Sequence, residues 1–129
     1  MGYSHSKRVV YLLNYHFVFV PKYRWKLLRG AIKERLLALF NDYAERYNVT
    51  ILAVEVLLDH VHLFLSARPS VAPSQIALYL KGWTSRVLRQ EFPWLQKYKA
   101  FWTPSYFVCS SGNVSSETIK RYIEESQNV

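Results

Sequence analysis

The chain has 129 residues, which is enough for one domain with a single core but short for two. Half of the residues are hydrophobic and 16% are aromatic, which excludes a disordered or fibrous protein. Seventeen Lys and Arg residues against nine Asp and Glu residues give a formal charge of +8, and this balance favours a polyanionic partner such as nucleic acid. A membrane-surface protein and a basic globular protein without such a partner are the alternatives, because net charge does not say where the charges lie.

The sequence also bears on cellular location. No apolar run reaches the roughly 18 to 20 residues that span a bilayer. The first residues, Met1 to Arg8, lack the apolar core of a signal peptide. The single cysteine, Cys109, excludes an internal disulfide and a multi-cysteine zinc site, and it suits a reducing compartment. We therefore expect a cytoplasmic protein that does not bind membranes.

The first half of the chain predicts a strand, a helix and a hairpin. Residues 12–20 are rich in β-branched and aromatic types and predict a strand. Apolar residues recur at helical spacing over 31–47, which indicates an amphipathic helix packed on a sheet. Residues 50–57 and 61–66 predict two further strands, and the break between them is too short for a helical crossover, so they form a hairpin.

The second half predicts a helix over 72–91, a strand over 105–109 and a last helix over 116–126. The resulting order βαββαβα matches a ferredoxin-like split βαβ arrangement with one added helix. We predict a single α+β domain over residues 1–129, with an antiparallel sheet of four to five strands and helices on one face. That fold hosts many functions, so it decides none by itself.

Two histidines in the predicted hairpin could bind a metal ion. His60 and His62 are two residues apart in a strand, so both imidazoles point to the same face. A pair of partly exposed structural histidines is the alternative. Asp59 is one residue out of phase and faces away unless the turn twists it, in which case it could orient a histidine.

A tyrosine on the last helix could act as a nucleophile. Tyr122 follows Lys120 and Arg121. A phenol is a weak nucleophile at neutral pH because its ordinary pKa is about 10, but nearby cations and a metal-polarised phosphate would help it attack. A ring that merely packs on the sheet is the alternative reading.

Basic and aromatic residues alternate over residues 21–26, and a second basic patch lies on the second helix; both predict contacts with nucleic acid. Cations pair with phosphates, and rings stack on unpaired bases, so single strands are the expected ligand. A solvated loop or helix face is the alternative. The expected DNA-binding residues are Lys22, Tyr23, Arg24 and Trp25 in the first segment, Lys81, Arg86 and Arg89 on the second helix, and Lys120 and Arg121 beside the tyrosine.

Taken together, five ordered segments resemble one family. They are Tyr15-His16-Phe17-Val18-Phe19-Val20-Pro21-Lys22-Tyr23-Arg24, Asp59-His60-Val61-His62-Leu63, Lys81-Gly82, Ser105-Tyr106-Phe107 and Lys120-Arg121-Tyr122-Ile123-Glu124. The set resembles the single-tyrosine HUH transposases of small bacterial and archaeal insertion sequences, to which REP-associated tyrosine transposases are related. The resemblance covers nearly the whole chain, and the ordered combination is far more specific than any one segment.

The resemblance implies a homodimer that cuts and joins single-stranded DNA and recognises DNA hairpins. It implies that His60 and His62 bind magnesium or manganese and that Tyr122 attacks a DNA phosphate, leaving a 5′-phosphotyrosine and a free 3′-hydroxyl. It implies no small-molecule cofactor. In many relatives the tyrosine helix of one subunit completes the site of the other, so the choice between cis and trans is open.

One departure from the family concerns the third metal ligand. Relatives commonly have a glutamine four residues after the tyrosine, where this chain has Ser126, and Gln127 comes one residue later. The helical period turns Gln127 roughly 140° away from Tyr122, whereas Glu125 lies at a better angle. We favour Gln127, which reaches the site if the helix frays. A non-catalytic module that binds single-stranded DNA or RNA and a degenerate transposase acting as a hairpin-binding regulator are the alternative functions.

Overall fold

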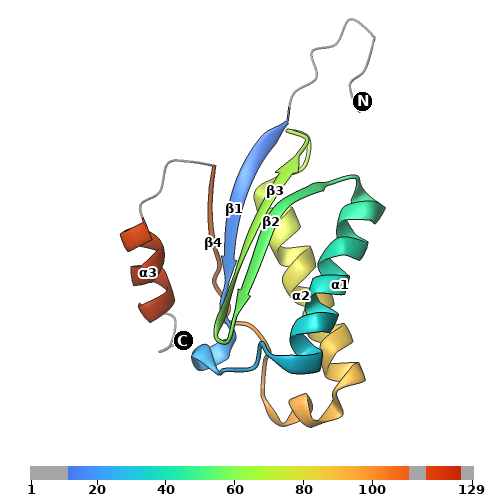
Figure 1. Cartoon of the computed structure of the whole chain (residues 1–129), viewed down its shortest axis with the longest axis vertical. Coiled ribbons are helices and arrows are strands. Elements are labelled where there is room, and N and C mark those ends of the chain that lie inside the picture. Colours follow the sequence, from blue (N-terminus) through green and yellow to red (C-terminus); the bar gives the residue numbers. More distant parts are fainter. Residues whose placement is uncertain (1–11, 111–115, 126–129) are drawn as a thin grey trace, which may run out of the picture.

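A computed structural model describes residues 12–110 and 116–125, with the backbone alone for 116–120 (Figure 1). No helix of that described part is long and apolar enough to cross a membrane. The strands are β1 (Leu13–Phe19), β2 (Thr50–Leu57), β3 (His60–Ala67) and β4 (Phe107–Ser110), and the α-helices are α1 (Gly30–Tyr47), α2 (Pro73–Glu91) and α3 (Ser116–Glu125). Two short 3-10 helices, η1 (Lys22–Arg24) and η2 (Pro93–Lys97), follow β1 and α2.

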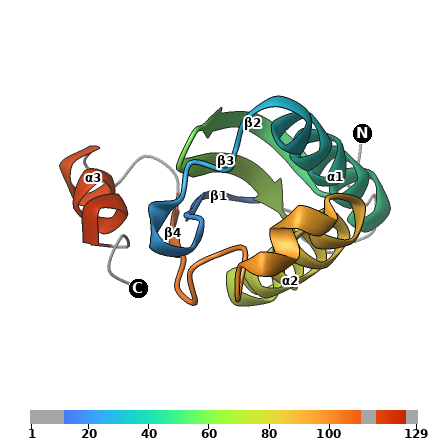
Figure 2. The same cartoon turned by 90° about the horizontal axis from the view of Figure 1, so that it is seen from below.

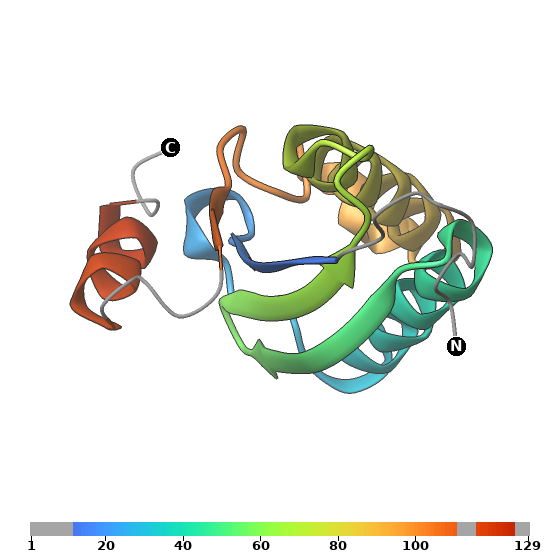
Figure 3. The ribbon, with the colours of Figure 1, turned by 90° about the horizontal axis from the view of Figure 1, so that it is seen from above.

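The four strands form one antiparallel sheet in the order β2-β3-β1-β4. Helices α1 and α2 pack together against it, and α3 lies beyond β4 on the other side of the molecule (Figures 2 and 3). This is the strand order of a ferredoxin-like split βαβ unit, so the predicted α+β class is confirmed, as are the antiparallel sheet, expected to have four to five strands and found with four in the described residues, and the helices on one face.

The second half of β1 is buried on both faces, which explains why its last three residues are all apolar. Phe17 and Phe19 are at most 1% exposed and belong to the core beneath α1 and α2. On the opposite face, Val18 and Val20 are fully buried and pack with Ile123 of α3. The last helix therefore covers the face of β1 that α1 and α2 leave open.

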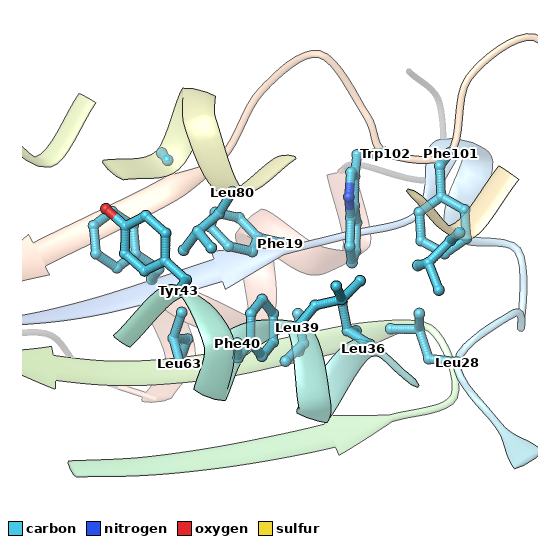
Figure 4. Packing of buried hydrophobic residues seen from close by; sticks show 14 of the residues in the cluster. Phe19, Leu28, Leu36, Leu39, Phe40, Tyr43, Leu63, Leu80, Phe101 and Trp102 are labelled. Atoms are coloured by element: carbon cyan, nitrogen blue, oxygen red, sulfur yellow. The ribbon is translucent and has the colours of Figure 1, made fainter. Parts of the chain in front are cut away.

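The main core lies between the sheet and the two long helices (Figure 4). Phe101 and Trp102 close one end of it, and the Trp102 indole N–H donates to the Thr84 hydroxyl at 3.0 Å. That hydroxyl in turn donates to the Leu80 carbonyl at 2.6 Å, so the buried polar atoms are satisfied. The segment before β4 is thereby fixed to α2.

The observed fourth strand begins two residues later than predicted. We expected it to start at Ser105, but pairing with β1 begins at Phe107. Pro104 has no backbone N–H, and the Ser105 carbonyl accepts a hydrogen bond from the Lys81 ammonium at 2.7 Å. Both features divert the backbone from the sheet just before β4.

Candidate functional site

His60 and His62 lie side by side on β3, on the face away from α1 and α2. The intervening Val61 and the next residue, Leu63, are at most 1% exposed and point into the main core. The two imidazole ring centroids are 5.0 Å apart with their planes nearly perpendicular. The expected shared face of the two histidines is therefore present.

Asp59 turns toward His60 in the tight β2–β3 connection. Its Oδ1 is 2.8 Å from Nδ1 of His60, and its Oδ2 accepts from Nε of Arg24 at 2.9 Å. Burial acts to raise the pKa of this carboxyl, but the hydrogen bonds and charges of His60 and Arg24 outweigh it and lower the pKa. An ionised Asp59 holds the proton of His60 on Nδ1, which leaves Nε2 as the nitrogen with a lone pair.

Arg24 reaches this carboxylate because the chain makes an unusual turn after β1. Tyr23 and Arg24 both adopt the left-handed conformation, with φ of 56°, which costs roughly 1–2 kcal/mol for each residue other than glycine. A hydrogen bond of 2.8 Å from the Arg24 amide to the Pro21 carbonyl closes the turn. Such strain is typical of functional sites. Arg24, expected to bind DNA, is thus placed beside the histidines, and its contact with phosphate stays a prediction.

His16, which was not among the predicted site residues, also belongs to this site. It lies on β1, is 7% exposed and stacks on Phe64 with ring centroids 4.0 Å apart. Its Nε2 is 2.9 Å from Nδ1 of His62 on the neighbouring strand. A histidine next to the apolar run that ends the strand was the available signal, but only the strand register pairs His16 diagonally with His62.

Burial favours the neutral form of the two contacting imidazoles. It is the main cause that lowers the pKa of His16, with a smaller contribution from His62. It likewise lowers the pKa of His62, where His60 adds to the shift and Glu55 opposes it. Neutral imidazole is the form that binds metal ions.

The donor set fits part of a metal centre. The Nδ1 atoms of His60 and His62 are engaged by Asp59 and His16, so each ring has Nε2 left for a ligand. Within residues 12–110 and 116–125, no group of three or more His, Cys, Asp or Glu side chains could hold a metal ion. Glu125 therefore does not complete such a group in this conformation, and Gln127 lies outside the described residues.

Tyr122 lies on the same side of the sheet as the histidines. Its hydroxyl is 3.0 Å from the Ser105 hydroxyl, and its ring is 5.8 Å from that of Phe107 on β4. The next residue, Ile123, packs on Val18, which is the β1 partner of His62 in the strand register. Helix α3 thus covers β1 one strand away from the histidines. Arg121 is exposed, and the side chain of Lys120 is outside the described part.

Lys81 on α2 holds the segment that contacts Tyr122. Its ammonium donates to the carbonyls of Thr103 and Ser105, both at 2.7 Å. Burial lowers the pKa of this amine to about 8. Lys81 is therefore engaged within the domain, and the expected contact with DNA phosphate stays a prediction.

Replacing this ammonium tests its structural role. We expect Lys81→Met to lower the free energy of unfolding by about 1–3 kcal/mol, because two carbonyls lose a charged donor while the aliphatic stem is kept. Arg86→Met is the matched control on the exposed part of the same helix, with an expected change within about 0.5 kcal/mol. Urea denaturation measures both, and equal midpoints for the two variants would show that Lys81 does not anchor the segment.

The other cations and rings expected to bind DNA lie in two regions. Tyr23 is 49% exposed, with the Lys22 ammonium 5.0 Å from its ring centroid. Trp25 packs on Tyr98 and lines a groove of about 590 Å³ together with Trp94. The walls of this groove also include Lys26, Leu27, Arg29, Gly30, Ala31, Ile32 and Phe92. Aromatic and basic side chains are therefore combined in this groove.

The second region is the exposed side of α2. Arg86 is exposed and lines a shallow groove together with Arg89. Nitrogens of the Arg89 guanidinium lie 3.0 Å from the Tyr98 carbonyl and 3.4 Å from the Lys99 carbonyl, so this side chain also holds the loop after η2. Binding of DNA by Arg86 and Arg89 stays a prediction.

Comparison with known proteins identifies the family. The model of the IS200-like transposases matches residues 9–126. The ISDra2 transposase TnpA of Deinococcus radiodurans is 32% identical over 122 residues, covering 92% of this chain and 87% of that protein. The transposase for insertion sequence element IS200 of Salmonella typhimurium is 34% identical over 120 residues, covering 88% of this chain and 79% of that protein.

Two solved structures share the fold. A crystal structure from Deinococcus radiodurans, of a protein classed as a transposase, superposes with a TM-score of 0.86 at 30% identity and covers 96% of this chain and 98% of that one. A REP-associated tyrosine transposase bound to a REP hairpin gives a TM-score of 0.53 at 16% identity, covering 95% and 69%, which shows a likeness of fold alone. With nearly all of its length matched by the family model and by relatives above 30% identity, the chain belongs to the family of IS200-like transposases.

Proposed function

We propose that this transposase cleaves single-stranded DNA with Tyr122 and rejoins it through a 5′-phosphotyrosine. The observation that carries the proposal is the placement of two metal-competent histidines and the tyrosine helix on one face of the sheet, with Ile123 packed on the strand partner of His62. A tyrosine without such a neighbourhood has no means of activating a phosphodiester.

The proposed cleavage is a displacement at phosphorus. The Tyr122 oxygen loses its proton and forms a bond to phosphorus, while the bond from phosphorus to the 3′ oxygen breaks and that oxygen leaves as a hydroxyl. Strand transfer is the reverse displacement, in which a 3′-hydroxyl attacks the phosphotyrosine and releases the phenol. No nucleotide energy is consumed, because each phosphodiester is exchanged for a phosphotyrosine ester.

A divalent metal is part of the proposal. Magnesium or manganese bound through Nε2 of His60 and His62 would polarise a phosphate oxygen and stabilise charge on the leaving 3′ oxygen. Asp59, which is itself paired with Arg24, holds the His60 imidazole, and imidazole ligands suit manganese better than magnesium. We propose Gln127 as the third ligand.

We further propose a DNA hairpin as the ligand and a homodimer as the active form. The structural relative with a TM-score of 0.53 holds a REP hairpin. Here the exposed ring of Tyr23, the groove beside Trp25 and Trp94 and the net charge of +8 provide stacking surfaces and cations for unpaired bases and phosphates.

The polarity of the covalent adduct tests the reaction. Single-stranded oligonucleotides that tile the DNA flanking the gene are labelled at either end and incubated with the protein and manganese. We expect 3′-labelled DNA to migrate with the protein on a denaturing gel, and a 5′-labelled fragment to be released with a 3′-hydroxyl. EDTA and fully duplex DNA are the controls.

The opposite polarity, or equal adduct formation in EDTA, would contradict the proposed chemistry. Tight, salt-sensitive binding of a hairpin with no adduct at any substrate would instead indicate a non-catalytic binding module or a degenerate transposase that acts as a regulator.

A further inference from the structure

Two histidines of neighbouring strands form a partly buried contact on the face of the sheet that carries the candidate metal site. His16 Nε2 lies 2.9 Å from Nδ1 of His62, and the two ring centroids are 5.1 Å apart. The contact is partly buried, since His16 is 7% exposed and His62 is half-buried. Two neutral imidazoles at this distance form one hydrogen bond, in which the N–H of one ring donates to the bare nitrogen of the other. The direction of that hydrogen bond decides which nitrogen of His62 has a lone pair.

Only one direction is compatible with a metal on the exposed side of His62. If His16 donates from Nε2, then Nδ1 of His62 is the acceptor, and the proton of His62 sits on Nε2, where it blocks a metal. If His62 donates from Nδ1, then Nε2 has a lone pair. A hydrogen bond to the second ring nitrogen commonly fixes the tautomer and orientation of a metal-binding histidine.

We propose that His16 is a positioning residue: its Nε2 accepts a hydrogen bond from Nδ1–H of His62, which leaves the lone pair of His62 Nε2 facing the metal. This inference rests on the proposed metal site. His60 and His62 are then oriented by different acceptors, the Asp59 carboxylate for one and a neutral imidazole for the other.

The placement of His16 suits this role. Its ring is stacked on Phe64 with planes 15° apart, and Phe64 is its direct partner in the β1–β3 register. The ring is therefore held by a contact that does not depend on His62. A phenylalanine at position 16 would keep the stacking and the ring shape but offer no acceptor, whereas a glutamine can bring its amide oxygen near the position of Nε2.

Manganese affinity and tautomer together test the inference. We expect His16→Phe to weaken manganese binding by about 10- to 100-fold, measured by electron paramagnetic resonance of free Mn²⁺, and His16→Gln to recover most of that loss. Long-range ¹H–¹⁵N spectra of the metal-free protein at neutral pH are expected to show His62 protonated on Nδ1, and to show a mixture of tautomers in His16→Phe.

Three outcomes separate this inference from the proposed function. If the wild-type protein binds no manganese, or His62→Ala binds it as well as the wild type does, the metal site itself is wrong. If His62→Ala loses manganese but His16→Phe binds like the wild type, or His62 carries its proton on Nε2 in the wild type, only the role of His16 is overturned. If His16→Phe and His16→Gln lose affinity equally, in step with their melting temperatures, His16 is purely structural and the inference again fails.

Discussion

Tyr122→Phe is expected to abolish covalent attachment of DNA while the protein remains folded and binds DNA. The substitution removes one atom, the only one that can form the bond to phosphorus, and keeps the ring packed beside Phe107. The lost hydrogen bond to Ser105 lies at the surface, so the free energy of unfolding changes by no more than about 1 kcal/mol. Adduct is measured on denaturing gels, and mass spectrometry of the wild-type adduct locates the nucleotide on Tyr122.

Ser105→Ala is the matched control for this experiment. It removes the same hydrogen bond from the opposite side but leaves the nucleophile in place. We expect it to form the adduct at a rate comparable to that of the wild type. An adduct retained in Tyr122→Phe, or found by mass spectrometry on another tyrosine, would overturn the assignment of the nucleophile.

Tyr122→Phe, mixed with His60→Ala, also decides whether each active site is built within one chain or from two. In the structure, α3 packs on its own domain through Ile123, Val18 and Val20. In a dimer with exchanged helices, mixing His60→Ala with Tyr122→Phe protomers creates one site with both lesions and one with neither, so activity partly returns. In a cis arrangement every site carries one lesion, and the mixture stays inactive.

The sequence predicted the elements well because their patterns are local. Helix α1 and strand β2 lie within one residue of their predicted bounds, since a stripe of apolar residues and a run of β-branched residues each reflect burial of that segment alone. The start of β4 was predicted two residues too early: Pro104 is a local signal against a strand there, whereas the second cause is distant, because the Lys81 ammonium on another element occupies the Ser105 carbonyl.

The same difference between local patterns and distant contacts decides which residues of the site could be predicted. Alternation along one strand placed His60 and His62 on a common face, and their proximity along the chain suggested that Asp59 could orient one of them. His16 is 46 residues from His62, and no local pattern connects them. The pairing of β1 with β3 brings His16 and His62 into contact. Arg24 likewise reaches Asp59 through a turn with two residues in the left-handed conformation, and neither of them is a glycine that would have signalled that turn.

His60→Ala and His62→Ala are each expected to reduce metal-dependent cleavage by about 100-fold or more and to leave hairpin binding within a few-fold of the wild type. Each substitution removes an imidazole proposed to hold the metal that polarises the phosphate, whereas the cations and rings proposed to bind DNA lie on other elements. Cleavage rates at saturating manganese and fluorescence anisotropy with a labelled hairpin measure the two effects separately.

Asp59→Asn provides a graded comparison for these two variants. It keeps the size of the side chain and an oxygen that can accept from His60 Nδ1, but it loses the charge that pairs with Arg24. We expect a cleavage rate between those of the wild type and His60→Ala, with more of the loss recovered at high manganese because the imidazole itself is still present. Cleavage by His60→Ala and His62→Ala at the wild-type rate would remove the metal from the mechanism. A parallel loss of stability, hairpin binding and cleavage would instead mean that the histidines serve the fold. Removing one metal-binding side chain from an intact domain would leave stability and hairpin binding unchanged.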